Sequence, residues 1–98
     1  MSDKLIQCRN RIDEIDKELM KLFEERMKVV LDVAQYKKEN NMPIFHKERE
    51  NQVIEKNLNR IENKELLPYA EEMLHILMDI SKKYQHNKIK IMENTLDK

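Results

Sequence analysis

A long apolar seam runs through the first third of the chain. Its members recur at alternating steps of three and four residues, which is the spacing of one packed face of a helix. In order, they are Leu5, Cys8, Ile12, Ile15, Leu19, Leu22, Arg26, Val29, Val33 and Tyr36. The seam predicts one helix over residues 4–40. The helix should end near Asn40 and Asn41, because asparagine tolerates the left-handed conformation of a helix cap and Pro43 resists continuation.

Two shorter apolar stripes follow the predicted long helix. The first predicts a helix of residues 47–62, ending before Asn63, and consists of Val53, Ile54, Leu58 and Ile61. The second predicts a helix of residues 67–90, with Pro68 in its first turn, and consists of Ala70, Met73, Leu74, Leu77, Ile80, Ser81 and Tyr84. We expect roughly the last eight residues to be frayed. The fold class is therefore predicted to be all-α, with one domain of three helices over residues 1–98.

The length of the first predicted helix indicates a partner. A helix of residues 4–40 would be about 55 Å long, whereas a compact domain of this size has a radius of gyration of about 13 Å. The helix therefore extends beyond any globule that its own chain can build. Its apolar seam needs a second molecule to cover it.

The composition narrows the function classes. Charged residues make up 39% of the chain, and 19 basic residues balance 19 acidic ones. This balance argues against a general nucleic-acid binder, which would carry a basic excess. No apolar run is long enough to span a bilayer or to act as a signal peptide. We therefore expect no membrane partner. The single Cys8 cannot form an internal disulfide, so we expect a cytoplasmic protein.

Arg26 is the one seam position that is neither apolar nor aromatic. A guanidinium facing a core is costly unless an anion meets it, and we expect that anion to be a ligand rather than a side chain of a neighbouring helix. Lys37 returns to within about 20° of the same face, roughly 16 Å along the axis. Arg9 lies about 100° round the helix and roughly 26 Å away from Arg26. If Arg9 belongs to the same site, it must come from a second copy of the chain.

The remaining polar candidates are weak when each is taken alone. Ser81 and Gln85 lie one turn apart at the end of an apolar stripe, where they line a pocket or simply emerge into water. Arg49 and Glu50 open the second predicted helix, where dipole complementation and surface charge also explain them. The histidines show no metal-ligand spacing, so no metal or cofactor is expected. No nucleophile or obvious general base is visible, which points to chemistry by positioning and charge.

Taken together, these residues resemble a known family, the all-helical class of chorismate mutases, over residues 5–87. The matching segments are Arg9-x-x-Ile12-Asp13-x-Ile15-Asp16-x-x-Leu19-x-x-Leu22-x-x-x-Arg26, Val33-Ala34-x-x-Lys37, Pro43-Ile44, Glu48-Arg49-Glu50-x-x-Val53 and Ser81-x-x-x-Gln85. Their order and spacing make the set specific, and the resemblance is to the monofunctional, stand-alone members. It implies the rearrangement of chorismate to prephenate, in phenylalanine and tyrosine biosynthesis, by an intertwined homodimer with two equivalent sites.

The resemblance also implies roles for individual residues. Arg26 would hold one substrate carboxylate, and Arg9 of the partner subunit would grip the other. Lys37 would contact a carboxylate and the ether oxygen, to which Gln85 would donate a hydrogen bond. Glu50 would accept a hydrogen bond from the ring hydroxyl.

Three further positions complete the implied site. Arg49 and Ser81 would finish the wall around the ring carboxylate. His46 departs from the family pattern, which often has an acidic residue there that contacts the substrate hydroxyl. Here that contact would come from the main chain alone, or His46 would lie outside the site.

Two other functions stay open at this point. An isochorismate pyruvate-lyase shares the fold, although Glu50 and Gln85 fit the mutase pattern better. A non-catalytic helical dimerisation module would explain the seam. It would not explain why Arg26, Lys37 and Gln85 occur together.

Overall fold

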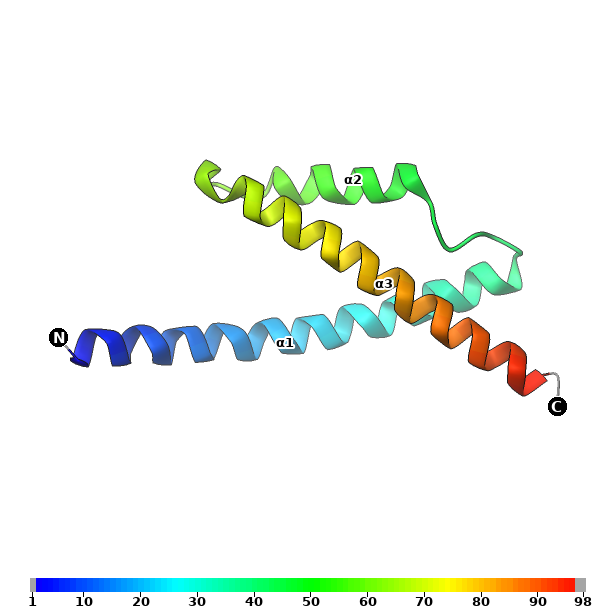
Figure 1. Ribbon diagram of the computed structural model, residues 1–98, viewed down its shortest axis with the longest axis horizontal. Helices are drawn as coiled ribbons and strands as arrows, with labels where there is room; N and C mark the ends of the chain where they lie inside the picture. Colours follow the sequence, from blue (N-terminus) through cyan, green and yellow to red (C-terminus); the bar gives the residue numbers. More distant parts are fainter. Residues whose placement is uncertain (1, 97–98) are drawn as a thin grey trace. The chain divides into compact units, whose positions relative to one another are not determined.

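The computed structural model describes residues 2–96 of the chain, and the side chains of residues 3–93. Its elements are three α-helices and one short 3₁₀ helix, with no strand in the described range (Figure 1). The all-α class predicted from the three apolar patterns is confirmed. The sequence predicts one domain, whereas contacts divide the chain into two compact units, Met1–Val30 and Leu31–Lys98. The boundary falls inside the first helix.

Helix α1 spans Ser2–Glu39 and begins two residues before the predicted start. Asp3 lies in its first turn and Lys37 and Lys38 in its last, so charges at both ends complement the helix dipole. The helix contains neither glycine nor proline, so nothing in its sequence interrupts the hydrogen-bond ladder. The long uninterrupted helix expected from the seam is present.

The end of α1 is a left-handed cap of the kind that the two asparagines predict. Asn41 has a φ of 54°, which an asparagine accepts more readily than most residues. The Met42 amide donates to the Lys37 carbonyl at 2.7 Å, and the Asn41 amide donates to the Lys38 carbonyl at 3.3 Å. This pair of bonds is the Schellman motif, which satisfies the last carbonyls of the helix.

Helix α2 spans Lys47–Leu58 and ends earlier than the predicted residue 62. The Asn57 side chain donates to the Val53 carbonyl at 2.8 Å, and a turn follows at once. Asn63 does not mark the end of this helix. Its side chain accepts from the Glu65 amide and caps the 3₁₀ helix η1, Lys64–Leu66. Asparagine is a strong N-cap residue. Asn63 therefore does mark a helix boundary, but the boundary is the start of η1 and not the end of α2.

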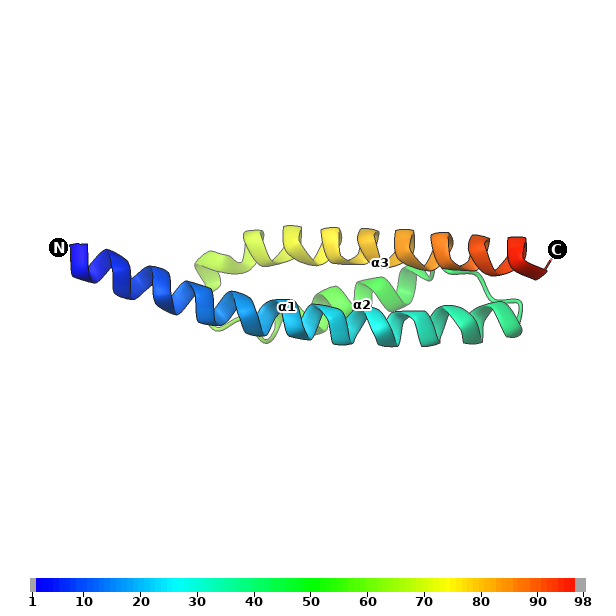
Figure 2. The same ribbon diagram turned by 90° about the horizontal axis from the view of Figure 1, so that it is seen from below.

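Helix α3 spans Leu67–Leu96 and starts where Pro68 predicts. It continues past the expected end at residue 90 and includes most of the segment that we expected to be frayed (Figure 2). Half-buried Lys88, Ile89 and Met92 extend its inner face, and no glycine or proline breaks it. Residues 97 and 98, the rest of that segment, lie outside the described part of the chain.

The buried side chains of the second unit lie mainly on one face of α3, which packs against α2. The buried residues of α3 are Ala70, Leu74, Met78, Ser81 and Gln85, at steps of four, four, three and four residues. Ala34, near the end of α1, is fully buried in the same unit. No helix in the described residues has an apolar stretch long enough to cross a bilayer.

Candidate active site

Helix α3 places two hydrogen-bonding side chains inside the protein. Ser81 and Gln85 are both buried, with Gln85 only 7% exposed, so they do not emerge into water as the simpler interpretation required. The Ser81 hydroxyl donates to the Leu77 carbonyl at 2.7 Å, and Gln85 Nε2 donates to the Ser81 carbonyl at 3.3 Å.

The Gln85 amide has unused hydrogen-bonding capacity. Its Oε1 is buried and has no hydrogen-bond partner in the described chain. A side-chain amide carries two N–H donors, and one of those on Gln85 is used within the helix. A buried polar atom without a partner costs free energy, so it calls for an explanation such as a bound water, an ion or a catalytic role. Gln85 can therefore serve a ligand without breaking any tertiary contact.

Lys37 lies at the end of α1 and is half-buried. Its Nζ donates to the Ile44 carbonyl at 2.8 Å, so the ammonium holds the loop that leads to α2. An ammonium has three donors, and this bond uses one of them. Lys37 is thus a fixed positive charge that can still bind an anion.

The start of α2 carries the other candidates from the second unit. His46 is the N-cap residue, but its side chain is exposed and makes no capping hydrogen bond. Its backbone carbonyl accepts from the Glu50 amide at 3.0 Å, so the main chain serves the first turn of the helix. Arg49 is exposed, whereas Glu50 is half-buried. The turn therefore directs the Glu50 carboxylate inward and leaves Arg49 at the surface of this single chain.

Sequence reasoning missed Lys82. Its Nζ lies 3.2 Å from Glu50 Oε2, so the two residues join α3 to α2. The available signal was its position, because Lys82 directly follows Ser81 and precedes Gln85 by less than one turn. Taken alone, a lysine on a helix with so many charged residues usually lies exposed on the surface.

Arg9 and Arg26 both lie in the first unit, on α1. Arg9 is exposed and Arg26 is half-buried. Because one helix carries both, the helical rise separates their Cα atoms by about 26 Å. The chain therefore does not bring these two predicted site residues together.

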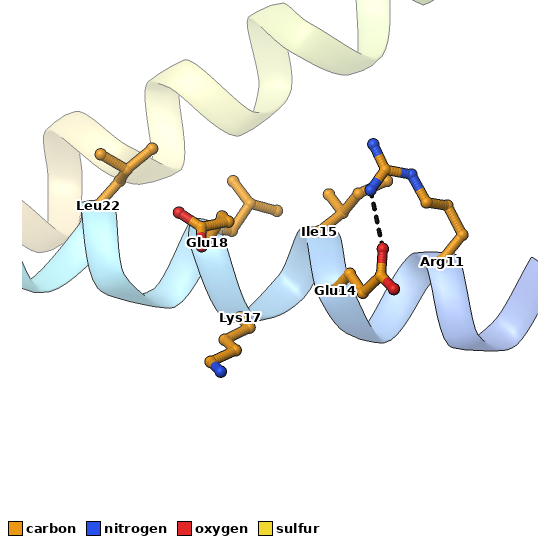
Figure 3. Close-up of a pocket in the computed structure, with 7 residues that line it drawn as sticks. Arg11, Glu14, Ile15, Lys17, Glu18 and Leu22 are labelled. Atoms are coloured by element: carbon orange, nitrogen blue, oxygen red, sulfur yellow. Dashed lines mark hydrogen bonds and ion pairs between the residues drawn. The ribbon is translucent and has the colours of Figure 1, made fainter.

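A hollow lies along α1 beside the part of the seam between Arg11 and Leu22 (Figure 3). Its lining consists of Arg11, Glu14, Ile15, Lys17, Glu18, Leu19 and Leu22. Arg11 and Glu14 form an exposed ion pair at 3.0 Å beside it, and Lys17 points to the opposite side of the helix from Leu22. No predicted site residue lines this hollow. No group of three or more metal-binding side chains gathers within the described residues either.

Comparison with known proteins decides the family. The sequence pattern of chorismate mutase type II matches residues 8–86, which include every predicted site residue. The chain belongs to the chorismate mutase type II family. This confirms the resemblance drawn from Arg26, Lys37, Gln85 and their neighbours.

Several curated relatives have chorismate mutase in their names. The chain is 34% identical over 101 residues to a bifunctional chorismate mutase/prephenate dehydratase of Buchnera aphidicola subsp. Baizongia pistaciae. That alignment covers 93% of this chain and 27% of the relative. It is 39% identical over 56 residues to a chorismate mutase of Methanocaldococcus jannaschii, covering 57% of each protein. A bifunctional chorismate mutase/prephenate dehydratase of Aquifex aeolicus is 35% identical over 81 residues, covering 80% of this chain and 22% of the relative.

The chain thus spans about a quarter of the length of the bifunctional relatives and just over half of the Methanocaldococcus jannaschii protein. No solved structure matches it at a significant level.

Proposed function

We propose that this protein is a chorismate mutase that converts chorismate to prephenate by an intramolecular Claisen rearrangement. In this reaction the ether C–O bond breaks while a new C–C bond forms within one molecule, so no external nucleophile or proton carrier is needed. Membership of the family and the absence of an obvious nucleophile from the sequence both support this reaction class. The rearrangement requires only restraint of the substrate and stabilisation of the charge that develops.

The observation that carries the proposal is the burial of the Gln85 amide, whose Nε2 carries a second N–H beyond the one that donates to the Ser81 carbonyl. A neutral donor in a dry site stabilises the negative charge that grows on the breaking ether oxygen. Water would screen the same donor at a helix end. Gln85 is therefore assigned to the ether oxygen, and Lys37 is assigned to the same oxygen and to a substrate carboxylate.

Glu50 is assigned to the ring hydroxyl, because a carboxylate accepts hydrogen bonds and this one faces inward. Ser81 and Arg49 complete the wall around the ring carboxylate. His46 contributes through its main chain, since its exposed side chain caps nothing. Together these residues would restrain chorismate, a flexible dianion, in a reactive diaxial conformation, which is a proximity effect.

A homodimer follows from the two arginines and the seam. Arg26 holds one substrate carboxylate, and Arg9 is too far along the same helix to reach the same small molecule. Arg9 of the partner subunit therefore supplies the second cation. The exposure of the apolar seam along α1 supports this arrangement, because large exposed apolar faces are typically covered by a partner. The cytoplasm suits an enzyme whose exposed Cys8 has no internal disulfide partner.

The test is an absorbance assay of chorismate loss, followed by identification of the product. The proposal predicts prephenate from chorismate and no pyruvate from isochorismate. Release of pyruvate from isochorismate would instead favour the lyase. A folded protein that consumes neither substrate would indicate the dimerisation module and overturn the enzyme assignment.

A further inference from the structure

One lysine outside the predicted site is built into the second unit. Lys82 Nζ lies 3.2 Å from Glu50 Oε2 and 3.3 Å from Glu50 Oε1, and 32 residues separate the two in sequence. Their side chains are 26% and 21% exposed, so most of the ion pair is out of water. Pairs at this depth are screened less than surface pairs, and a charge-assisted hydrogen bond is stronger than a neutral one.

The other contacts of Lys82 keep its ammonium in place. Nζ lies 4.8 Å from the centroid of the Phe45 ring, a cation–π distance. It also lies 3.7 Å from Asp79 Oδ1, but Asp79 is exposed and only one turn away on the same helix. Exposed pairs of this kind contribute little. The ammonium is therefore held between an aromatic ring of the loop and the Glu50 carboxylate of α2.

The Glu50 carboxylate keeps hydrogen-bonding capacity for a substrate. An ionised carboxylate offers about four lone-pair positions, and the Lys82 ammonium faces both oxygens. At least one position on each oxygen stays available to a hydroxyl donor. A carboxylate held in this way loses little side-chain freedom when the hydroxyl binds, which is the advantage of preorganisation.

The register of α3 connects this ion pair to the candidate site. Lys82 directly follows Ser81 and is three residues before Gln85, both of which are buried. Ser81, Lys82 and Gln85 thus lie within two turns of one helix. A shift of α3 would move all three together relative to Glu50.

We propose that Lys82 is a positioning residue, which orients the Glu50 carboxylate so that it accepts the ring hydroxyl of the substrate. The inference rests on the proposed function, since Glu50 has this role only in the mutase. Lys82 acts through Glu50 and is not assigned a contact with the substrate. The competing view is that Lys82 is only a structural link between α2 and α3.

The experiment compares the steady-state kinetics of Lys82→Met, Lys82→Arg and Lys83→Met. Methionine keeps an unbranched stem of similar length without the charge, arginine restores the ion pair, and Lys83 is the exposed neighbour. A hydroxyl contact made in both the ground and transition states changes KM and leaves kcat unaltered. We expect Lys82→Met to raise KM about tenfold, and Lys82→Arg and Lys83→Met to stay within about threefold of the unmodified protein.

A double-mutant cycle separates positioning from an independent effect. If Lys82 acts through Glu50, adding Lys82→Met to Glu50→Gln changes KM by less than about twofold. A full tenfold effect in the Glu50→Gln background would overturn the inference, as would an unchanged KM for Lys82→Met alone. A lower melting temperature with unchanged KM would identify a structural link and would also overturn it.

Two controls keep the result decisive. If Lys82→Met fails to fold, Lys82→Gln replaces it, because the shorter amide is polar but carries no charge, and the same rise in KM is expected. If the unmodified protein does not consume chorismate, the proposed function fails and this inference fails with it. An active protein that is insensitive to Lys82 substitution would remove the positioning role alone.

Discussion

Helices α1 and α3 carry the same kind of apolar pattern, but the pattern differs in how much of it is exposed. On α3 one face of the pattern is buried, with Leu74 only 5% exposed, although Met73 beside it is 58% exposed. On α1 within Met1–Val30 the seam is open, and Leu19 is 51% exposed. Both patterns follow steps of three and four residues. Periodicity therefore identifies the face that must be covered, but not the molecule that covers it.

The contrast extends to the polar residues of the proposed site. The second unit contains Lys37, Glu50, Ser81 and Gln85, each at least half-buried within it. The first unit contributes Arg9 and Arg26, which the helix itself holds apart. In the proposed site, the second unit supplies most of the residues, and a second copy of the chain would supply Arg9.

The largest expected effect comes from placing a charge on the exposed seam of α1. Leu19→Asp places a carboxylate where the proposed dimer is apolar, and an unpaired charge there is costly. An interface weakened by about 3 kcal/mol binds about 100-fold more weakly. We expect sedimentation at micromolar concentration to shift from the dimer to the single chain, with loss of mutase activity.

Lys17→Asp is the matched control for Leu19→Asp. It introduces the same residue two positions away, on the side of α1 opposite Leu22 (Figure 3). This variant should keep the mass and activity of the unmodified protein. Equal behaviour of the two variants would show that the seam is not an interface.

The next largest effect is expected at Gln85, the neutral donor proposed in the second unit. At pH 7 an ordinary glutamate is ionised and can only accept, so Gln85→Glu would repel the negative charge on the ether oxygen. Loss of one such donor typically costs about 10²–10³-fold in rate. Burial at this position raises the pKa of an introduced carboxyl, and the protonated form donates as the amide does. Activity of the variant should therefore rise as the pH falls towards that pKa.

Rate measurements across pH check this prediction. The unmodified protein should show no matching rise on acidification, because an amide does not titrate. Gln52→Glu, the same substitution at an exposed position of α2, should behave like the unmodified protein. A flat pH profile for Gln85→Glu, or full activity at pH 7, would remove Gln85 from the site.

The smallest expected effect lies at the cap that ends α1. Asn41 has a left-handed backbone, which costs a residue with a Cβ about 1–2 kcal/mol relative to glycine and less for asparagine. Asn41→Ala should lower the free energy of unfolding by about 1 kcal/mol, and Asn41→Gly should not lower it. Chemical denaturation at a fixed protein concentration measures both. A stabilised Asn41→Ala variant would contradict the cap.

The fold could be predicted where a local signal is unambiguous. The α1 seam together with Asn41 and Pro43 located both the helix and its end. Asn63 misled because asparagine serves both at helix ends and as an N-cap, and the sequence alone does not say which helix it belongs to. The extra turns of α3 were missed because Lys90 and Glu93 make this segment look polar, although Ile89 and Met92 are half-buried.

The site was predictable only in part, for a different reason. Ser81 and Gln85 are one turn apart, so a helix is enough to bring them together. The pair of Lys82 with Glu50 depends on how α2 packs against α3, and no periodicity relates residues 32 positions apart. The proposed role of Arg9 depends on a second molecule, which the order of residues in one chain does not describe.

If two copies of the chain build each site, as we propose, mixing two inactive variants tests this most directly. Arg9→Ala and Arg26→Ala should each be inactive, because every site in either homodimer carries a lesion. In a mixed dimer, one site carries both lesions and the other carries none. Unfolding and refolding an equal mixture should therefore restore about a quarter of the normal activity, if the chains pair at random. A refolded mixture as inactive as its two parents would contradict the shared site.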